Sequence, residues 1–242
     1  MTQLETKNKA WLHSDYARQV FATECKALEL AMRQALGPST LQIGRRLDES
    51  VIENCDLPFV VRSSANVSDF GDSTELVADP AFLPFAPESF STVVLPHVLE
   101  GHELPHQVLR EAHRVLRSEG HLVLSGFNPM SLLGIQRWLN RRAVFNGNYY
   151  TARRVIDWLQ LLGFDVVASM PYQYAPLSKN QRIRKSFQFL ESIGDRWLPM
   201  AGGGYMITAK RRDLGMTLVG KLKYKKTKPG RLATSPVKTA LK

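Results

Sequence analysis

The stretch "LPHQVLREAHRVLRSEGHLVLSG" (residues 104–126) has the clearest structural pattern in the sequence. Its apolar residues recur at the spacing of one face of a helix: Val108, Leu109, Ala112, Val115 and Leu116. Gly120, a residue type common at helix ends, is expected to close that helix. The run "HLVLSG" that follows is short and apolar, as in a buried strand. The stretch therefore predicts a helix that leads into a strand of the core.

Similar apolar runs recur along the chain, and several lack polar alternation, as in sheets covered on both faces. The further predicted strands are 40–44, 59–61, 75–78, 92–95, 164–169 and 204–210. Helical spacing predicts two more helices, at 14–36 and 151–162. Thr151 is a candidate N-cap of the second helix, and Gly163 is its expected stop. Strands that alternate with helices predict an α/β fold with a doubly wound, mostly parallel sheet.

Composition limits the class of protein. The chain has 242 residues and 44% hydrophobic residues, which is ordinary for a globular protein with a real core. Its two cysteines, Cys25 and Cys55, are too few for a disulfide framework. No apolar run is long enough to span a membrane, and the first residues lack the apolar centre of a signal peptide. We therefore expect a cytoplasmic protein with no membrane span.

Positive charge is concentrated at the C-terminal end. The formal net charge is +10, and residues 210–242 hold 11 of the 32 basic residues but only one acid, Asp213. The rest of the chain is neutral, with 21 basic and 21 acidic residues. We expect 214–242 to form a disordered basic tail after a domain at 1–213. The tail is either a solubilising extension or a tether for nucleic acid or another anionic surface.

The stretch 79–134, "DPAFLPFAPESFSTVVLPHVLEGHELPHQVLREAHRVLRSEGHLVLSGFNPMSLLG", resembles class I S-adenosylmethionine-dependent methyltransferases. Family members show an acid, then "LPF", then "LRE..RVL" before the next strand, and the resemblance extends to about residue 169. It implies a Rossmann-like sheet of seven strands, S-adenosylmethionine as cofactor, and methyl transfer to an unidentified small-molecule acceptor. In such a fold, the segment 170–203 is a candidate lid or substrate-facing insertion.

The resemblance also implies positions for the cofactor. Asp79 matches the acid that receives the adenine amino group, and Phe82 and Leu83 match the segment that lines the adenine. Pro96 and His97 match the turn that flanks the reactive methyl group. An amine does need an acceptor, and a ring needs apolar walls. The alternative for Asp79 is a turn residue before a proline.

The expected cofactor loop is unusual. In "LQIGRRLDES" (41–50), Gly44 is the only glycine, where cofactor loops typically have two or three. Arg45 and Arg46 follow it and either pair with the cofactor's carboxylate or, as we favour, point to solvent. The family's ribose carboxylate is also replaced, and Asp69 or Asp72 are candidate substitutes.

Chemistry at such a site depends mainly on in-line positioning, and a base is needed only if the acceptor arrives protonated. His97 is the first candidate base because its ordinary pKa lies near neutrality, and Glu100 is the second. The alternative for His97 is a structural histidine at the end of a strand. Further histidines lie at 102, 106 and 113, but their spacing does not match a metal site, and we expect none.

A second function class also fits the sequence. A methyltransferase-like scaffold could bind RNA or a protein through the basic tail without catalysing methyl transfer. The reduced glycine loop favours this alternative, and the intact 79–134 stretch favours an enzyme.

Overall fold

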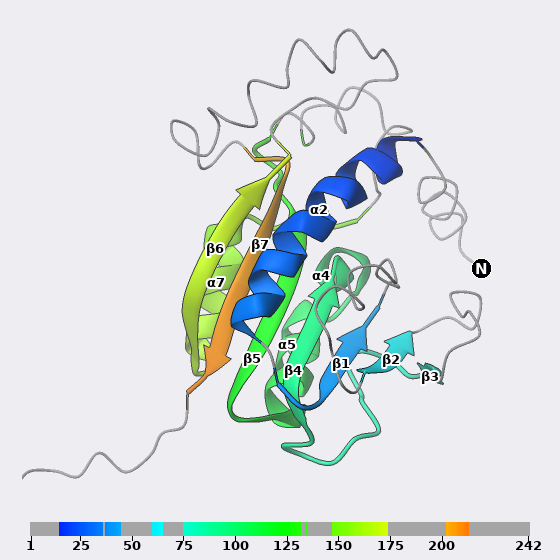
Figure 1. The fold of residues 1–242 in the computed structure, drawn as a ribbon, viewed down its shortest axis with the longest axis vertical. Helices are drawn as coiled ribbons and strands as arrows, with labels where there is room; N and C mark the ends of the chain where they lie inside the picture. The colour runs from blue at the N-terminus through cyan, green and yellow to red at the C-terminus, as the bar shows by residue number, and fades with distance from the viewer. Residues whose placement is uncertain are drawn as a thin grey trace, which may run out of the picture.

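Seven strands form one sheet in the order β3-β2-β1-β4-β5-β7-β6 (Figure 1). The structure is a computed structural model that describes residues 15–35, 37–44, 60–64, 75–131, 134, 147–173 and 202–212. The strands are β1 Thr40–Ile43, β2 Val60–Ser64, β3 Glu75–Val77, β4 Phe90–Pro96, β5 Leu116–Phe127, β6 Phe164–Tyr172 and β7 Gly204–Arg211.

The pairing of these strands confirms the predicted sheet. β1 is parallel to β2 and β4, β2 is parallel to β3, and β4 is parallel to β5. Only β7 runs against its neighbours, pairing antiparallel with both β5 and β6. The result is the mostly parallel, doubly wound, Rossmann-like sheet of seven strands that the sequence predicts.

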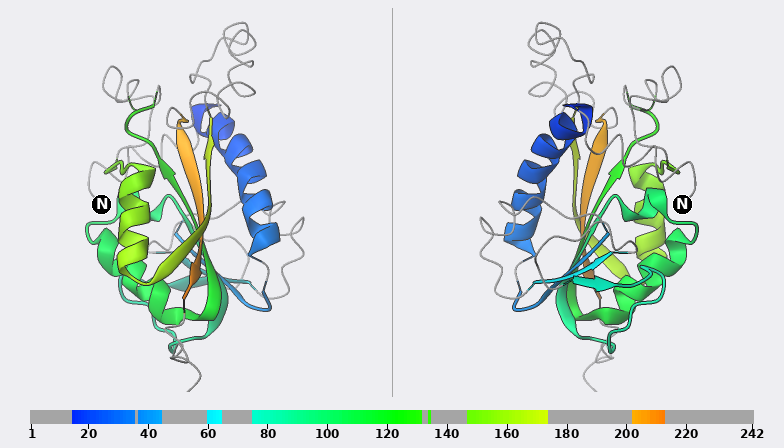
Figure 2. Two further views of the ribbon diagram at one scale, coloured as in Figure 1. Left: turned by 90° about the vertical axis from the view of Figure 1, so that its left-hand side faces the viewer. Right: turned by 90° about the vertical axis from the view of Figure 1, so that its right-hand side faces the viewer.

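Helices cover both faces of the sheet. Helix α2 (Asp15–Gln34) lies on one face, and α5 (Pro105–Val115) and α7 (Ala152–Leu161) lie on the other (Figure 2). The short helix α4 (Val98–Gly101) directly follows β4. Both predicted helices outside the opening stretch are therefore confirmed within their described residues. The Thr151 side chain caps α7 by accepting a hydrogen bond from the N–H of Arg154, and Gly163 ends the segment at φ +89°.

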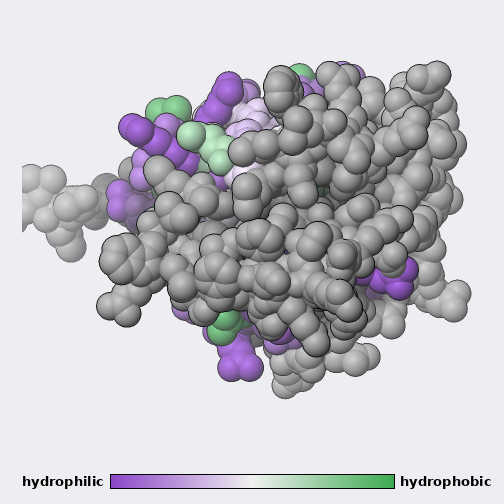
Figure 3. Space-filling view, turned by 90° about the horizontal axis from the view of Figure 1, so that it is seen from above, coloured by the Kyte–Doolittle hydropathy of each residue, from purple (hydrophilic) through white to green (hydrophobic). Residues whose placement is uncertain are grey.

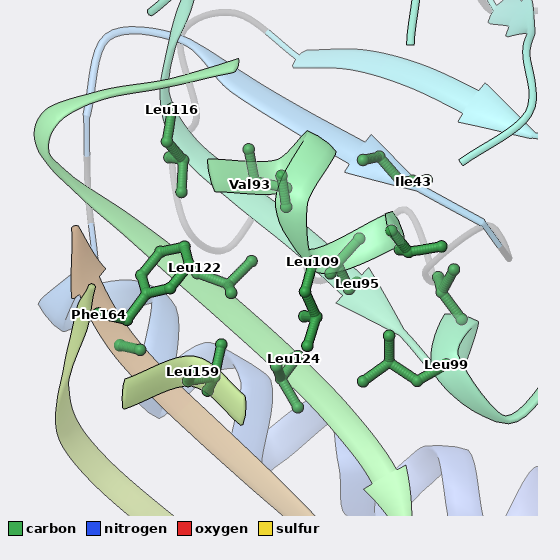
Figure 4. Packing of buried hydrophobic residues seen from close by; sticks show 14 of the residues in the cluster. Ile43, Val93, Leu95, Leu99, Leu109, Leu116, Leu122, Leu124, Leu159 and Phe164 are labelled. Carbon is green, nitrogen blue, oxygen red and sulfur yellow. The ribbon is translucent and has the colours of Figure 1, made fainter. Parts of the chain in front are cut away.

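The core has two parts, one on each face of the sheet. The larger part lies between the sheet and helices α5 and α7, and Figure 4 shows its leucines and valines meeting from both layers. The smaller part lies beneath α2 and includes Val20, Leu28, Val94, Val123 and Phe127. Burial on both faces agrees with the continuous burial of β1, including its polar Thr40 and Gln42, and with the mostly apolar sequence of β4.

The predicted end of the helix in the opening stretch is wrong. Helix α5 ends at Val115, and Leu116 is already the first residue of β5, where it pairs with Phe90 of β4. Gly120 does not stop a helix. Its backbone passes so close to its neighbours that an added Cβ would lie 2.9 Å from the carbonyl oxygen of Arg117 and 3.0 Å from that of Ser91.

The segment predicted as a lid or insertion, 170–203, is only partly described. Its first residues belong to β6, which runs to Tyr172, so the predicted start at residue 170 is wrong, and the insertion itself stays a prediction. Residues 174–201 and the basic tail lie outside the described residues. Within the described part of the chain, no helix is both long enough and apolar enough to cross a membrane.

Candidate functional site

The strand order reverses between β1 and β4, which is where parallel α/β sheets bind their ligands. Gly44 follows β1 at this point with φ +90°, and its N–H donates to the carbonyl of Ser63 at 2.8 Å. A Cβ on Gly44 would lie 2.5 Å from Cγ2 of Val98, the first residue of α4. Both the dihedral angle and the contact require glycine here. The other residues considered for this part of the site, Arg45, Arg46, Asp69 and Asp72, lie outside the described residues.

Asp79 lies two residues after the end of β3, with its side chain half exposed. Its Oδ1 accepts hydrogen bonds from the N–H of Ala81 at 2.8 Å and from Nε2 of His102 at 2.9 Å. The Ala81 hydrogen bond is the main cause of a lowered pKa of Asp79. Burial opposes it, and the hydrogen bond and charge of His102 lower the pKa further. Asp79 is therefore an ionised turn residue that still reaches solvent.

The tautomer of His102 follows from its contacts. Its Nδ1 accepts a hydrogen bond from the N–H of Leu104 at 3.0 Å, so Nδ1 carries no proton. Nε2 therefore carries the proton and donates a hydrogen bond to Oδ1 of Asp79. His102 thus holds the carboxylate of Asp79 in one orientation, a role that the sequence did not indicate.

Phe82 and Leu83 differ in their surroundings. The Phe82 ring is 65% exposed, whereas Leu83 is buried among the core residues that pack against α5. Any adenine in this region would therefore meet the side chain of Phe82 but only the backbone of Leu83. That Phe82 lines the adenine stays a prediction. The burial of the Leu83 side chain argues against a contact between that side chain and the adenine.

Two residues of the "LRE..R" motif hold the segment 82–85 in place. Glu111 Oε2 accepts the N–H of Leu83 at 3.0 Å. Arg114 donates to the carbonyls of Leu83 and Phe85, at 2.9 and 2.7 Å, and to both carboxylate oxygens of Glu111. The Arg114 guanidinium is the main cause of a lowered pKa of Glu111. Glu111 and Arg114 lie one turn apart on a helix, and this spacing could have indicated from the sequence that they form an ion pair.

His97 follows Pro96, the last residue of β4, and is the N-cap of α4, with a left-handed backbone at φ 52°. Its ring is buried and stacks on Phe127 with centroids 4.0 Å apart. Nδ1 lies 3.1 Å from Oε1 of Glu100, one turn later. The two predicted candidate bases are thus in direct contact.

A third charged residue, Glu24 of α2, meets His97 from the opposite side. Its Oε1 lies 3.3 Å from Nε2 of His97 and accepts a hydrogen bond from Ser125 at 2.5 Å. The hydroxyl of Tyr172 lies 3.3 Å from the same Nε2. Sequence reasoning missed Glu24, although a glutamate on the apolar face of α2, between Val20 and Leu28, was an available signal.

Burial and charge oppose each other at His97. Burial alone would lower the pKa of His97, but the carboxylates of Glu24 and Glu100 raise it to about 9. The expectation of a pKa near neutrality is therefore not met, and the ring is an imidazolium at pH 7. Burial also raises the pKa of Tyr172 well above its usual value, and the same two carboxylates raise it further.

Glu100 keeps one carboxylate oxygen free. Its Oε1 accepts the N–H of Phe127 at 2.6 Å in addition to facing His97. Its Oε2 is buried and has no hydrogen-bond partner among the residues that the structure describes. A buried carboxylate oxygen without a donor is unfavourable, and native proteins seldom leave one without a reason.

The remaining histidines of the predicted cluster lie in separate surroundings. His102 pairs with Asp79, His106 packs on Trp158, and His113 meets the ring of Phe164 edge-on. Within the described ranges no group of three or more histidine, cysteine or acidic side chains, the Glu24, His97 and Glu100 contacts included, has an arrangement that could hold a metal ion. Figure 3 views the molecule from above; most of the described residues visible there are hydrophilic, with a few apolar ones.

Known proteins resemble this chain in sequence and fold. A protein-family model described as a methyltransferase domain matches residues 42–124. The Escherichia coli (strain K12) protein YafS is 33% identical over 211 residues, which cover 84% of this chain and 82% of YafS.

Solved structures agree on the fold. A SAM-dependent methyltransferase of Thermotoga maritima superposes with a TM-score of 0.62 at 14% identity, covering 87% of this chain and 97% of that chain. An S-adenosylmethionine-dependent methyltransferase of Mesorhizobium loti gives a TM-score of 0.55 at 17% identity, covering 77% and 96%. The solved structures and the strand order show that the chain has the class I methyltransferase fold. The domain match identifies it as a member of the methyltransferases whose cofactor is S-adenosylmethionine.

Proposed function

We propose that this protein transfers the methyl group of S-adenosylmethionine to a small-molecule acceptor. The observation that supports this most is the position of Gly44, Asp79 and His97. All three follow the carboxyl ends of parallel strands, the end at which such sheets bind ligands. Gly44 and His97 follow β1 and β4, between which the strand order reverses, and Asp79 follows β3, two strands beyond β1. The proposal assigns the cofactor to the β1 and β3 side of this reversal.

Each cofactor contact uses a group with suitable chemistry. The half-exposed carboxylate of Asp79 would accept the adenine amino group, and the exposed ring of Phe82 would cover the adenine. The turn at Gly44 would let the backbone approach the cofactor closely. S-adenosylmethionine supplies the electrophilic methyl group, so the chain contributes positioning and proton transfer.

Glu100 is the better candidate for proton transfer. His97 is already protonated at neutral pH and cannot accept a further proton, because its pKa is raised to about 9. Glu100 has an oxygen without a donor among the described residues. We therefore assign the base to Glu100 and assign His97 the role of holding it in position.

The test is a calorimetric titration of the purified, cofactor-free protein with S-adenosylmethionine and S-adenosylhomocysteine. We expect both to bind. Asp79→Ala should weaken binding roughly tenfold or more, because a hydrogen bond to a charged group is lost. The matched control is Asp165→Ala. Asp165 lies at the start of β6, is as exposed as Asp79, and pairs with Arg212. Failure of either compound to bind the folded wild-type protein would refute the proposal; unchanged affinity in Asp79→Ala would refute only the adenine contact.

The scaffold alternative rests on the charge of the C-terminal end. Three of its 11 basic residues belong to the folded domain, because Lys210, Arg211 and Arg212 pair with Glu119, Glu88 and Asp165. The tail at 214–242 has the other eight basic residues and no acid. RNA binding that is strong at low salt, lost at high salt and absent after deletion of 214–242 would support this alternative.

A further inference from the structure

The ring of His102 connects two parts of the chain that are separate in sequence. His102 comes directly after α4, and its side chain is 19% exposed. Nε2 donates to Oδ1 of Asp79, which lies 23 residues earlier, after β3. Nδ1 accepts the N–H of Leu104, the N-cap of α5. Because both ring nitrogens are used, the ring cannot turn without breaking a hydrogen bond.

The two oxygens of the Asp79 carboxylate have different surroundings. Oδ1 accepts two hydrogen bonds, from the N–H of Ala81 at 2.8 Å and from His102 at 2.9 Å. Oδ2 accepts none from the residues that the structure describes, and the side chain is 52% exposed. An ionised carboxylate oxygen with no protein donor takes its donor from water or from a ligand. Asp79 therefore offers one oxygen, in one orientation, to a ligand.

The described segment 80–84 has no backbone N–H left for a ligand. Two of its five residues are prolines, which have no N–H. The other three N–H groups already donate, to the carboxylate of Asp79, to the carbonyl of Asp79 and to Glu111. Adenine has a donor in its amino group and acceptors in its ring nitrogens. This part of the site can accept from the amino group but has no N–H for the ring nitrogens.

The connection that contains His102 also contacts the other end of the proposed cofactor site. Helix α4 begins at Val98, and a Cβ on Gly44 would lie 2.5 Å from Cγ2 of Val98. Four residues after Val98, His102 holds Asp79. Residues 98–102 thus touch both the turn after β1 and the acid after β3, and they fix these two proposed cofactor contacts relative to each other.

We propose that His102 is a positioning residue that makes the site selective for adenine: it holds Asp79 so that Oδ2 accepts the 6-amino group of the cofactor. This rests on the proposed methyltransferase function. His102 acts through Asp79, because a carboxylate that is already ordered loses less conformational entropy when the ligand arrives. A purine without the amino group would leave the charged oxygen without a donor, and the site would reject it.

The test compares S-adenosylhomocysteine with its 6-deamino analogue, in which a hydrogen replaces the amino group of adenine. In calorimetric titrations of the wild-type protein, we expect S-adenosylhomocysteine to bind at least about tenfold more tightly, because the analogue gives Oδ2 no donor. Equal binding of the two compounds by the wild-type protein overturns this inference and leaves the methyltransferase proposal standing. If S-adenosylhomocysteine itself does not bind, the methyltransferase proposal fails and this inference fails with it.

The variant His102→Asn separates positioning from a structural role. The asparagine oxygen can still accept the Leu104 N–H, but the donor to Asp79 is lost. The preference for the amino group should fall at least about threefold. A purely structural loss would weaken both compounds equally and leave their ratio unchanged, so an unchanged ratio in folded His102→Asn overturns the inference.

Two further proteins complete the experiment. In His106→Leu, the replaced histidine is exposed at the start of α5 and packs on Trp158, so the preference should stay at the wild-type value. In an Asp79→Ala background, adding His102→Asn should change the preference no further, because the residue through which His102 acts is already gone. An equal effect of His102→Asn with and without Asp79 would show that His102 does not act through this carboxylate and would overturn the inference.

Discussion

His97 is the residue whose properties depend most on its surroundings. An isolated histidine is half protonated near neutrality, and burial without partners would make it neutral. Here Glu24, Glu100 and Tyr172 face the ring, and the two carboxylates raise its pKa to about 9. The folded protein therefore binds a proton at His97 that the unfolded chain releases at lower pH.

This difference predicts a pH dependence of stability. Because the folded pKa is raised, the contribution is complete below the unfolded value of about 6.5 and is lost as pH rises through about 9. The linkage amounts to on the order of 3 kcal/mol. In urea unfolding, the wild-type protein should lose stability between pH 6.5 and 9.5 more steeply than His97→Gln.

The control for this experiment is His121→Gln. Burial lowers the pKa of His121, so its contribution to stability is lost as pH falls below about 6.5, not as pH rises. This variant should therefore keep the alkaline loss of stability. Identical pH profiles for His97→Gln and wild type would show that the folded pKa of His97 is not raised.

Sequence reasoning found His97 and Glu100 but not their chemistry. The position of His97 at the end of a strand could be predicted because the apolar run before it predicts a strand. Its partner Glu24 lies in a helix far away along the chain, and no local pattern joins the two positions. The pKa of a buried group depends on such distant neighbours, so the base assignment could not be settled from the sequence.

At the scale of elements, the segment 82–85 depends on helix α5 for its conformation. Replacing Arg114 by leucine removes the donors for two backbone carbonyls and leaves Glu111 without its ion pair. We expect a loss of roughly 1–3 kcal/mol in the free energy of unfolding and faster hydrogen exchange at the Leu83 N–H. Arg110→Leu, at an exposed position on the same helix, should change neither.

Helix α7 offers a simpler test at its start. Thr151→Ala removes the side-chain oxygen that accepts the Arg154 N–H and should cost about 1 kcal/mol. Thr151→Ser keeps that oxygen and should unfold at nearly the wild-type urea concentration. Equal losses in both variants would mean that packing of the threonine methyl group, not capping, stabilises the helix start.

Element types were predictable from local spacing, whereas some boundaries were not. The helical face that starts at Val108 is a local property, and it gave α5 correctly. Leu116 continued the same spacing but joins β5, because its backbone pairs with Phe90 in another strand. A contact between segments that are distant in sequence decided this boundary.

For the whole molecule, the folded domain uses the basic residues at the end of β7, and we expect it not to depend on the residues beyond them. Deleting residues 214–242 should leave the thermal midpoint of unfolding unchanged, because all three ion pairs of β7 and its end remain. Deleting 210–242 removes those pairs and the last ladder positions, and should lower the midpoint by several degrees. Equal midpoints for both truncations would contradict the expectation that residues 210–212 stabilise the folded domain and residues 214–242 do not.

The alternation of strands and helices predicted the class of sheet. The family resemblance predicted that the sheet has seven strands. Periodicity did not say that β7 would enter between β5 and β6, since that order is set by which exposed edges meet after the chain has collapsed. The face covered by α2, and with it the meeting of Glu24 and His97, follows from the same global arrangement.

The insertion of β7 has a consequence for how the protein is made. β6 lies at the edge of the sheet and pairs, among the described strands, only with β7. During synthesis, β6 therefore leaves the ribosome before the strand that attaches it to the sheet, and β5 has one open edge at the same time. Until residues 204–211 arrive, the edge of β5 and the edge of β6 that β7 later covers are both unpaired. Such edges are the surfaces through which unfinished chains pair with one another.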